Sequence, residues 1–225
     1  SGISVTGTDA GNYTANTTAN ITTRPITVTA NTNTKVYDTT TSAAAVPTLS
    51  VNTIATGDSA TMSETYDNAN VAGSPSKVLT PAIAITDGNS GNNYAVTLVN
   101  NSTGVITVAP VTVGFTADNK VYDGNNSATI LTRSVTGAIS PDVVTASSGT
   151  ATFSDKNVAS GKTVSATGFS INNTNYSITS VTGTTANITA KTLAVTAAAV
   201  NKQYDANTNA TVTFADDRVS GDVLT

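Results

Sequence analysis

The 225-residue chain contains no cysteine, no histidine and no tryptophan. Without cysteine it cannot form disulfides, use a thiolate nucleophile or hold zinc through sulfur. Without histidine it lacks the usual general base and the commonest metal ligand. No acid–base pair recurs in a glycine-rich or loop context. We therefore expect that the chain is not an enzyme and that it binds no cofactor.

Charge is also scarce. Charged residues make up 11% of the chain, whereas about 25% is typical. The formal net charge is −4 at pH 7, and the lysines and arginines are scattered singly. Binding of nucleic acid through a basic patch is thus disfavoured, as is docking to an acidic membrane surface. No apolar run approaches the roughly 18 residues that span a bilayer, so we expect no membrane insertion.

The chain is rich in threonine, valine, serine and asparagine. Apolar and polar residues alternate with period two, for example through Ile26, Val28 and Ala30. Turn-forming clusters separate such stretches at the roughly 8–12-residue spacing of all-β sandwiches. We predict an all-β fold, with small Ig-like β-sandwich domains in a linear tandem array. A β-grasp-like sheet with one short helix per repeat is the alternative.

An internal repeat is the strongest signal. A Lys-x-Tyr-Asp phrase begins at Lys35, Lys120 and Lys202, so its copies are 85 and 82 residues apart. An Asn-Tyr pair stands before each copy, and a turn-like Gly-Asp or Pro-Asp pair follows it. This period exceeds the roughly 20–50 residues of solenoid repeats and suits a small domain. The candidate motif residues are Lys35, Tyr37, Asp38, Tyr94, Lys120, Tyr122, Asp123, Tyr176, Lys202, Tyr204 and Asp205.

The repeat divides the chain into four expected segments. They are the C-terminal part of a preceding repeat (1–23), two whole repeats (24–108 and 109–190) and the N-terminal part of a following repeat (191–225). Neither partial repeat holds enough strands to close a core by itself. We expect each to pair with the adjacent whole repeat or with a neighbouring molecule along a fibre.

The Lys-x-Tyr-Asp phrase has two readings. In an extended strand Lys120 and Tyr122 share one face and Asp123 lies on the other, which would suit a ligand site or a covalent cross-link. We favour a structural reading, in which the tyrosine hydroxyl meets water or backbone and the aspartate shapes the next turn. Because Thr39 and Ala206 replace Gly124 in the other copies, we expect no requirement for positive φ there.

The stretch Asp87–Asn92 resembles part of an oxygen-rich calcium loop. It lacks the terminal glutamate of such loops, and the second repeat has Ile171-Asn172-Asn173 in its place. A Gly/Asn hairpin turn is the favoured interpretation.

Four ordered motifs carry a family resemblance. Tyr122-Asp123-Gly124, the D-K-N-V-A-S-G-K stretch at 155–162, Asn175-Tyr176 and the A-N-I-T-A-K-T-L stretch at 186–193 resemble the YDG domain. That domain recurs in very large bacterial surface proteins of the filamentous-haemagglutinin type and in other repetitive adhesins. The resemblance implies a secreted or cell-surface location and a mainly architectural role, and it supplies no catalytic site.

Two functions follow as hypotheses. The first is a structural stalk or fibre module of an exported adhesin, whose partners are adjacent repeats of the same chain or neighbouring copies. The parent protein would then supply any contact with a glycan or host receptor. The second is a lectin-like module that binds carbohydrate itself. Since lectin sites usually use an exposed aromatic platform and every tyrosine here sits at a repeated position, the stalk is favoured.

Overall fold

The computed structural model describes residues 6–13 and 20–224, and this range is all-β, as predicted. Its one helical element there is a single 3-10 turn, η1 (Ala10–Asn12). The short helix per repeat that the β-grasp alternative requires is therefore absent from the described range. None of the described residues forms a helix long and apolar enough to cross a membrane. Residues 1–5 and 14–19 of the expected N-terminal partial repeat lie outside the described residues.

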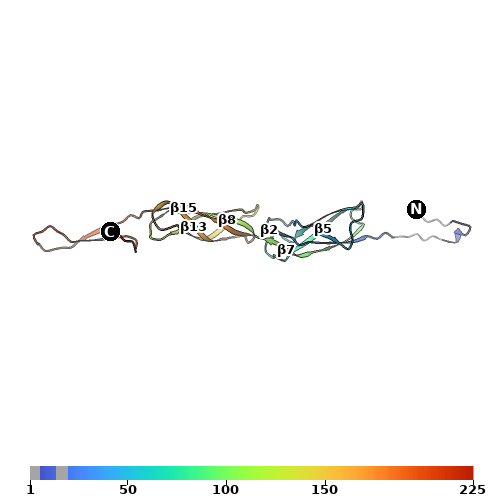
Figure 1. Ribbon diagram of the computed structural model, residues 1–225, viewed down its shortest axis with the longest axis horizontal. Coiled ribbons are helices and arrows are strands. Elements are labelled where there is room, and N and C mark those ends of the chain that lie inside the picture. The colour runs from blue at the N-terminus through green and yellow to red at the C-terminus, as the bar shows by residue number, and fades with distance from the viewer. Residues whose placement is uncertain (1–5, 14–19, 225) are drawn as a thin grey trace. The chain divides into compact units, whose positions relative to one another are not determined.

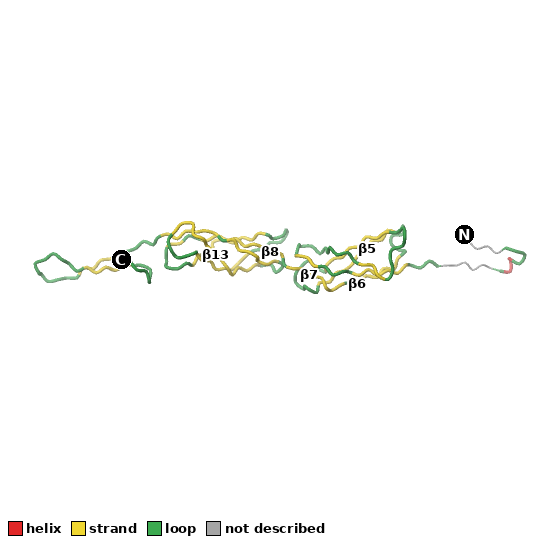
Figure 2. The backbone as a smooth tube through the Cα atoms, viewed as in Figure 1, coloured by secondary structure: helices red, strands yellow, loops and turns green. Residues whose placement is uncertain are grey.

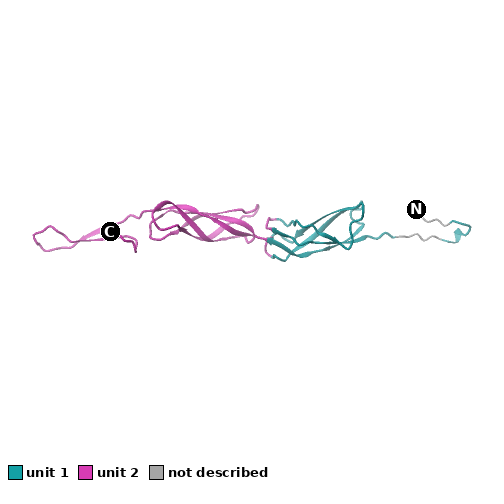
Figure 3. Ribbon diagram, viewed as in Figure 1, with its two compact units in different colours: residues 1–35, 40–69, 73–106 teal, residues 36–39, 70–72, 107–225 magenta. Residues whose placement is uncertain are grey.

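The chain forms two compact units (Figure 3). Unit 1 comprises residues 1–35, 40–69 and 73–106, and unit 2 comprises residues 36–39, 70–72 and 107–225. Unit 2 thus includes two short segments, 36–39 and 70–72, that belong by sequence to the first expected repeat. These two segments contribute to the candidate site described below.

The strands of unit 1 form two sheets (Figure 1). One sheet has the order β3-β1-β6 and the other the order β2-β7-β5-β4. The strands are β1 (Arg24–Thr29), β2 (Thr34–Val36), β3 (Thr48–Ser50), β4 (Ser59–Tyr66), β5 (Lys77–Thr86), β6 (Tyr94–Val99) and β7 (Asn101–Thr107).

Unit 2 repeats this plan and adds a hairpin; strands and connecting loops are distinguished in Figure 2. Its sheets have the orders β11-β8-β14, β10-β12-β13-β15-β9 and β16-β17. The strands are β8 (Ala109–Ala117), β9 (Lys120–Val121), β10 (Ser127–Ala128), β11 (Ile130–Thr136), β12 (Ala146–Phe153), β13 (Ala159–Ile171), β14 (Tyr176–Thr182), β15 (Thr184–Thr189), β16 (Val195–Ala199) and β17 (Val212–Asp216).

The strand that begins with each Asn-Tyr tyrosine pairs in parallel with the first strand of its repeat. Tyr94 lies opposite Arg24 in the β1–β6 pair, and Tyr176 lies opposite Ala109 in the β8–β14 pair. The strand β16 holds the corresponding place in the third, partial copy and pairs antiparallel with β17. Within the described range no strand pairs with the other edge of β16.

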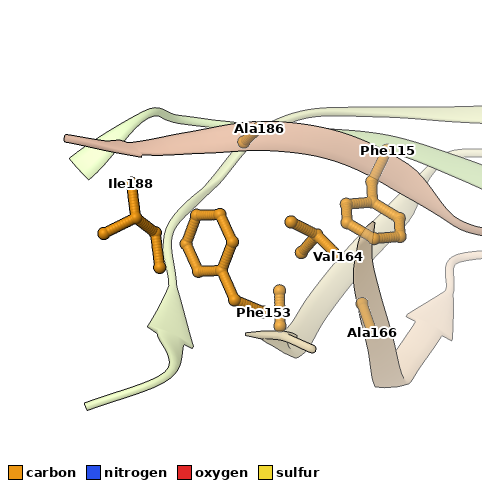
Figure 4. Packing of buried hydrophobic residues seen from close by; sticks show 7 residues of the cluster. Phe115, Phe153, Val164, Ala166, Ala186 and Ile188 are labelled. Carbon is orange, nitrogen blue, oxygen red and sulfur yellow. The ribbon is translucent and has the colours of Figure 1, made fainter. Parts of the chain in front are cut away.

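The core of unit 2 follows from the alternation of apolar residues along its strands. Phe115 of β8 packs with Phe153 of β12, Val164 of β13 and Ile188 of β15, so side chains from both larger sheets share one cluster (Figure 4). Val164 is completely buried, and the aromatic rings fill the space around it. Burial of such side chains contributes about 1.5–3 kcal/mol each, which offsets part of the entropy cost of ordering the chain.

Candidate functional site

Three aspartates end tight turns of the same form. The backbone N–H of Asp58, Asp142 and Asp222 donates to the carbonyl three residues earlier, at 3.1, 2.8 and 3.1 Å. These are the recurring Gly-Asp and Pro-Asp pairs of the sequence, and we call them the aspartate turns. Since the turn itself uses the backbone groups, each carboxylate remains available to accept hydrogen bonds from elsewhere.

The Asn-Tyr tyrosines bind the aspartate turn of their own repeat. The Tyr94 hydroxyl donates to Asp58 Oδ2 (2.6 Å) and accepts from the Ala55 N–H (2.9 Å). In the second repeat the Tyr176 hydroxyl donates to Asp142 Oδ2 (2.9 Å) and accepts from the Ile139 N–H (3.1 Å). The same two bonds therefore recur at matching positions.

The Lys-x-Tyr-Asp tyrosines bind the aspartate turn of the next repeat in sequence, and both examples lie within unit 2. The Tyr37 hydroxyl donates to Asp142 Oδ2 (2.7 Å), and its ring meets Tyr176 edge to face with centroids 5.4 Å apart. The Tyr122 hydroxyl donates to Asp222 Oδ1 (2.8 Å). The expectation that these hydroxyls meet water or backbone is therefore wrong, because each faces a carboxylate about one hundred residues further on.

Asn175 ties a second segment into the same cluster. Its side-chain oxygen accepts from the Val71 N–H (2.9 Å), and its side-chain nitrogen donates to Asn70 Oδ1 (3.0 Å). Its carbonyl accepts from the Ala109 N–H (2.9 Å), which fixes the start of β14 against β8. We call Tyr37, Asp142, Asn175 and Tyr176 the tyrosine–aspartate cluster.

The electrostatics of the cluster keep its hydroxyls protonated. Burial raises the pKa of Tyr37 and of Tyr176, and the hydrogen bonds to Asp142 raise both further. The hydrogen bond to Asp58, more than burial, raises the pKa of Tyr94. A tyrosine of raised pKa is a stable hydrogen-bond donor and a poor nucleophile. The arrangement can therefore hold chain segments together, and it does not suit covalent chemistry.

The motif lysines organise the loop that follows each Tyr-Asp. Lys120 Nζ donates to the carbonyls of Asn125 (2.8 Å) and Ser127 (3.0 Å) and pairs with Asp123 (2.7 Å). This pair lowers the pKa of Asp123. Our prediction that Asp123 lies on the face opposite Lys120 is wrong, because β9 ends at Val121 and the chain turns before the aspartate.

The other copies use their lysines in a similar way. Lys35 Nζ donates to the carbonyls of Thr40 (2.7 Å) and Ser42 (3.1 Å), and Lys202 Nζ pairs with Asp205 (2.8 Å). The expected turn-shaping bond forms at two aspartates, because Asp123 accepts from the Asn125 N–H and Asp205 from the Asn207 N–H. The third motif aspartate, Asp38, also has an interaction partner. Tyr204 differs from Tyr37 and Tyr122, since it is 94% exposed.

The residue after each Tyr-Asp adopts a left-handed backbone in all three copies. The φ angles are +69° at Thr39, +81° at Gly124 and +61° at Ala206. Our prediction that no positive φ is required there is wrong, since the turn imposes this conformation whichever residue occupies it. A β-branched residue at positive φ is strained, so Thr39 carries a conformational cost that Gly124 avoids.

Two lysines that the sequence gave no reason to single out are buried. Lys77 is 1% exposed and donates to Asn68 Oδ1 (2.6 Å), while Lys162 is 8% exposed and pairs with Asp155 (2.7 Å). Asn68 and Asp155 occupy matching positions, two residues after Tyr66 and Phe153. Neither the composition nor the spacing of the sequence distinguishes these two lysines from exposed ones, so their burial could not be predicted.

The Asp87–Asn92 stretch forms a turn closed by the Asp87 side chain. Our prediction of a hairpin turn is wrong, because the stretch joins β5 to β6, which belong to different sheets. Asp87 Oδ1 accepts from the N–H groups of Asn89 and Gly91 (both 2.8 Å), and Oδ2 accepts from the Asn93 N–H (3.2 Å). These bonds lower the pKa of Asp87. Both carboxylate oxygens thus already have partners, and no cluster of three or more potential acidic ligands occurs in the described part of the chain.

The aspartates of the tyrosine–aspartate pairs are the residues that sequence reasoning missed. Their recurrence at Asp58, Asp142 and Asp222 was visible as a turn signal. The pairing was not visible, because a repeat period shows which residues are equivalent and not which residues touch.

The comparisons with known proteins agree with the repeat. The family model of the YDG domain matches the chain twice, over residues 22–103 and 107–185. Searches among curated proteins and among solved structures gave no significant match.

Proposed function

The chain belongs to the YDG domain family, and from that premise we propose that it is a structural stalk or fibre module of an exported, repetitive bacterial adhesin at the cell surface. One observation carries the proposal. Tyr37 of the first matched region is buried against Asp142 and Tyr176 of the second. Such a contact links one repeat to the next, as in repeat arrays whose stability includes the interfaces between neighbours.

The fold we propose for each repeat is an Ig-like sandwich of two sheets. Its support is the core of unit 2, where Phe115 comes from one sheet and Phe153, Val164 and Ile188 come from the other. Aligned sheets that bury their inner faces against each other are typical of such sandwiches. The partners of the module are then its neighbouring repeats, and the parent protein supplies the contact with a receptor.

A non-catalytic role is part of the proposal. The tyrosine hydroxyls hold their protons more tightly than usual, and the motif lysines are engaged with loop carbonyls. These groups are already committed to holding the fold, which supports an architectural function.

Single-molecule force spectroscopy tests the proposal directly. The chain is held by its two ends and stretched at constant speed. We expect two separate unfolding events, each releasing roughly 80 residues and hence about 270 Å of chain. The Tyr37→Phe variant should lower the force of one event, while Tyr204→Phe, at an exposed position, should leave both unchanged. Extension without resolved unfolding events would contradict a load-bearing role.

One observation favours the second candidate, a lectin-like module. Tyr13 is 70% exposed and Tyr204 is 94% exposed, so each presents an aromatic face that a sugar ring can stack on. A glycan array probed with the chain and with Tyr204→Ala separates the candidates. Binding that the substitution abolishes would establish the lectin function, and an array without signal would leave the stalk as the supported function.

A further inference from the structure

A pocket of about 240 Å³ lies in unit 2 beside the hydrogen bond between Tyr122 and Asp222. Its lining includes Tyr122, Val158, Lys191, Leu193, Val219 and Asp222. The pocket therefore adjoins the third aspartate turn and the residues that lead into β16.

The tyrosine–aspartate cluster shows what occupies the matching place one repeat earlier. There the ring of Tyr176 packs against Tyr37 and its hydroxyl donates to Asp142. Asn175 holds the Val71 N–H at 2.9 Å. The counterparts of Tyr37, Asp142 and Val71 are Tyr122, Asp222 and Val158, because N-V-A stands at both 70–72 and 157–159. All three of these counterparts line the pocket.

Among the described residues, the strand next to the pocket pairs along one edge only. In the described range β1 and β8 each have a partner on both sides, β3 and β6 for the former and β11 and β14 for the latter, whereas β16 pairs with β17 alone. The exposure of the side chains differs accordingly. Val195 is 59% exposed, while its counterparts Val28 and Val113 are fully buried. Within the described residues, β16 thus lacks on one side the Asn-Tyr strand that β1 and β8 carry.

We propose that this pocket and the edge of β16 bind an Asn-Tyr strand supplied by another YDG repeat, in the place that β6 and β14 take within their own repeats. The inference rests on the proposed function, since it names the partner that a repeat array would present. The incoming strand runs parallel to β16 with its tyrosine opposite Lys191, as Tyr94 lies opposite Arg24 and Tyr176 opposite Ala109.

The contacts of the bound strand follow from the existing copies. The incoming hydroxyl donates to Asp222 and accepts from the Val219 N–H, as Tyr176 does at Asp142 and Ile139. The preceding asparagine accepts from the Val158 N–H and donates to Asn157. Charge does not oppose the docking, because the strands β6 and β14 that model the ligand contain no charged residue.

The test uses a synthetic peptide that copies residues 172–182 and the full-length, isotope-labelled chain. The peptide is titrated to millimolar concentration while the amide resonances are followed by NMR. We expect shifts confined to Tyr122, Val158, residues 191–199 and residues 219–222. The edges of β1 and β8 should not respond, because β6 and β14 already pair with them.

Matched variants assign the binding to the proposed contacts. A peptide with Tyr176→Phe lacks the hydroxyl and should bind roughly tenfold more weakly, which is the loss of one hydrogen bond to a charged group. Asp222→Ala in the chain should weaken binding of the original peptide to a similar degree, while Asp205→Ala, in a loop outside the pocket lining, should not.

Two results would overturn the inference. They are the absence of shifts at millimolar peptide and equal affinity of the original and phenylalanine peptides. Failure of peptide binding leaves the force-spectroscopy test of the stalk untouched, so the two proposals fail independently.

Discussion

At the scale of single residues, the Lys-x-Tyr-Asp motif shows that a sequence repeat predicts which positions are equivalent but not their backbone conformation. The positions of Tyr37, Tyr122, Tyr94 and Tyr176 at matching places in the two copies follow from spacing alone. The positive φ angle at Thr39 could not be predicted in this way. The surrounding turn determines this angle, whereas the residue type alone suggested that φ would be negative.

The strain at Thr39 gives the first prediction. Thr39→Gly should raise the free energy of unfolding by about 0.5–1 kcal/mol, because relief of the left-handed strain exceeds the added freedom of the unfolded chain. Urea denaturation measures the change. Thr41→Gly is the control, since its φ is not positive, and it should lower stability by a similar amount. Equal effects of both substitutions would show that Thr39 is not strained.

The buried hydroxyls of the tyrosine–aspartate cluster predict a dependence on alkaline pH. Folding raises the pKa of Tyr37 and Tyr176, so the folded state holds these protons more tightly than the unfolded chain. The resulting stabilisation is complete below the unfolded pKa of about 10 and is lost as pH rises through the higher folded pKa. Thermal unfolding between roughly pH 9 and pH 11 should show this loss.

The Tyr37→Phe variant tests the cause. It should be less stable at neutral pH by about 1–2 kcal/mol, because Asp142 loses a donor, and its stability should fall less steeply with alkaline pH. Tyr204→Phe serves as the control, since Tyr204 is 94% exposed. Identical alkaline profiles for wild type and Tyr37→Phe would contradict the assignment.

At the scale of elements, the two copies build the same hairpin with different chemistry. The buried lysine of β13, Lys162, pairs with Asp155 at 2.7 Å, whereas Lys77 of β5 donates to Asn68 and lies 3.8 Å from the Asp67 carboxylate. The alternation of apolar residues predicts strands here and predicts that the side chains of residues 77 and 162 point inward. Lysine side chains usually face solvent, however, so burial at these two positions is not expected. Strand existence is therefore accessible from sequence, while this buried polar pair is not.

This natural difference between copies predicts the order of two substitutions. Asp155→Asn should lower the melting temperature only slightly, because an amide oxygen can still accept from Lys162, as Asn68 does from Lys77. Asp155→Ala should lower it by roughly 5 °C, since Lys162 would remain buried without its partner. Calorimetry measures both. A variant order in which Asn is as damaging as Ala would show that the charge, rather than the acceptor oxygen, holds the lysine.

Acid should act on the same pair. Lys162 lowers the pKa of Asp155, so the stabilisation is present above the unfolded aspartate pKa of about 4 and is lost as pH falls through the folded value.

At the scale of the molecule, stability should differ along the chain. Val113 of β8 is fully buried, whereas Val195 of β16 is 59% exposed and its strand has one partner in the described range. We expect the amide hydrogens of residues 195–199 to exchange at least about a hundredfold faster than those of residues 111–115. Hydrogen exchange followed by mass spectrometry measures this, and equal protection of the two strands would contradict it.

The pairing of each Lys-x-Tyr-Asp tyrosine with the aspartate turn one repeat later has a consequence for the gene. Recombination between repeats that deletes or duplicates one whole period leaves every internal tyrosine facing an aspartate turn, wherever within the period the crossover falls. A crossover that is out of phase leaves one tyrosine and one aspartate without a partner. Alleles of such a gene should therefore differ in length by whole periods, and selection against intermediate lengths would act through these partly buried hydroxyl–carboxylate pairs.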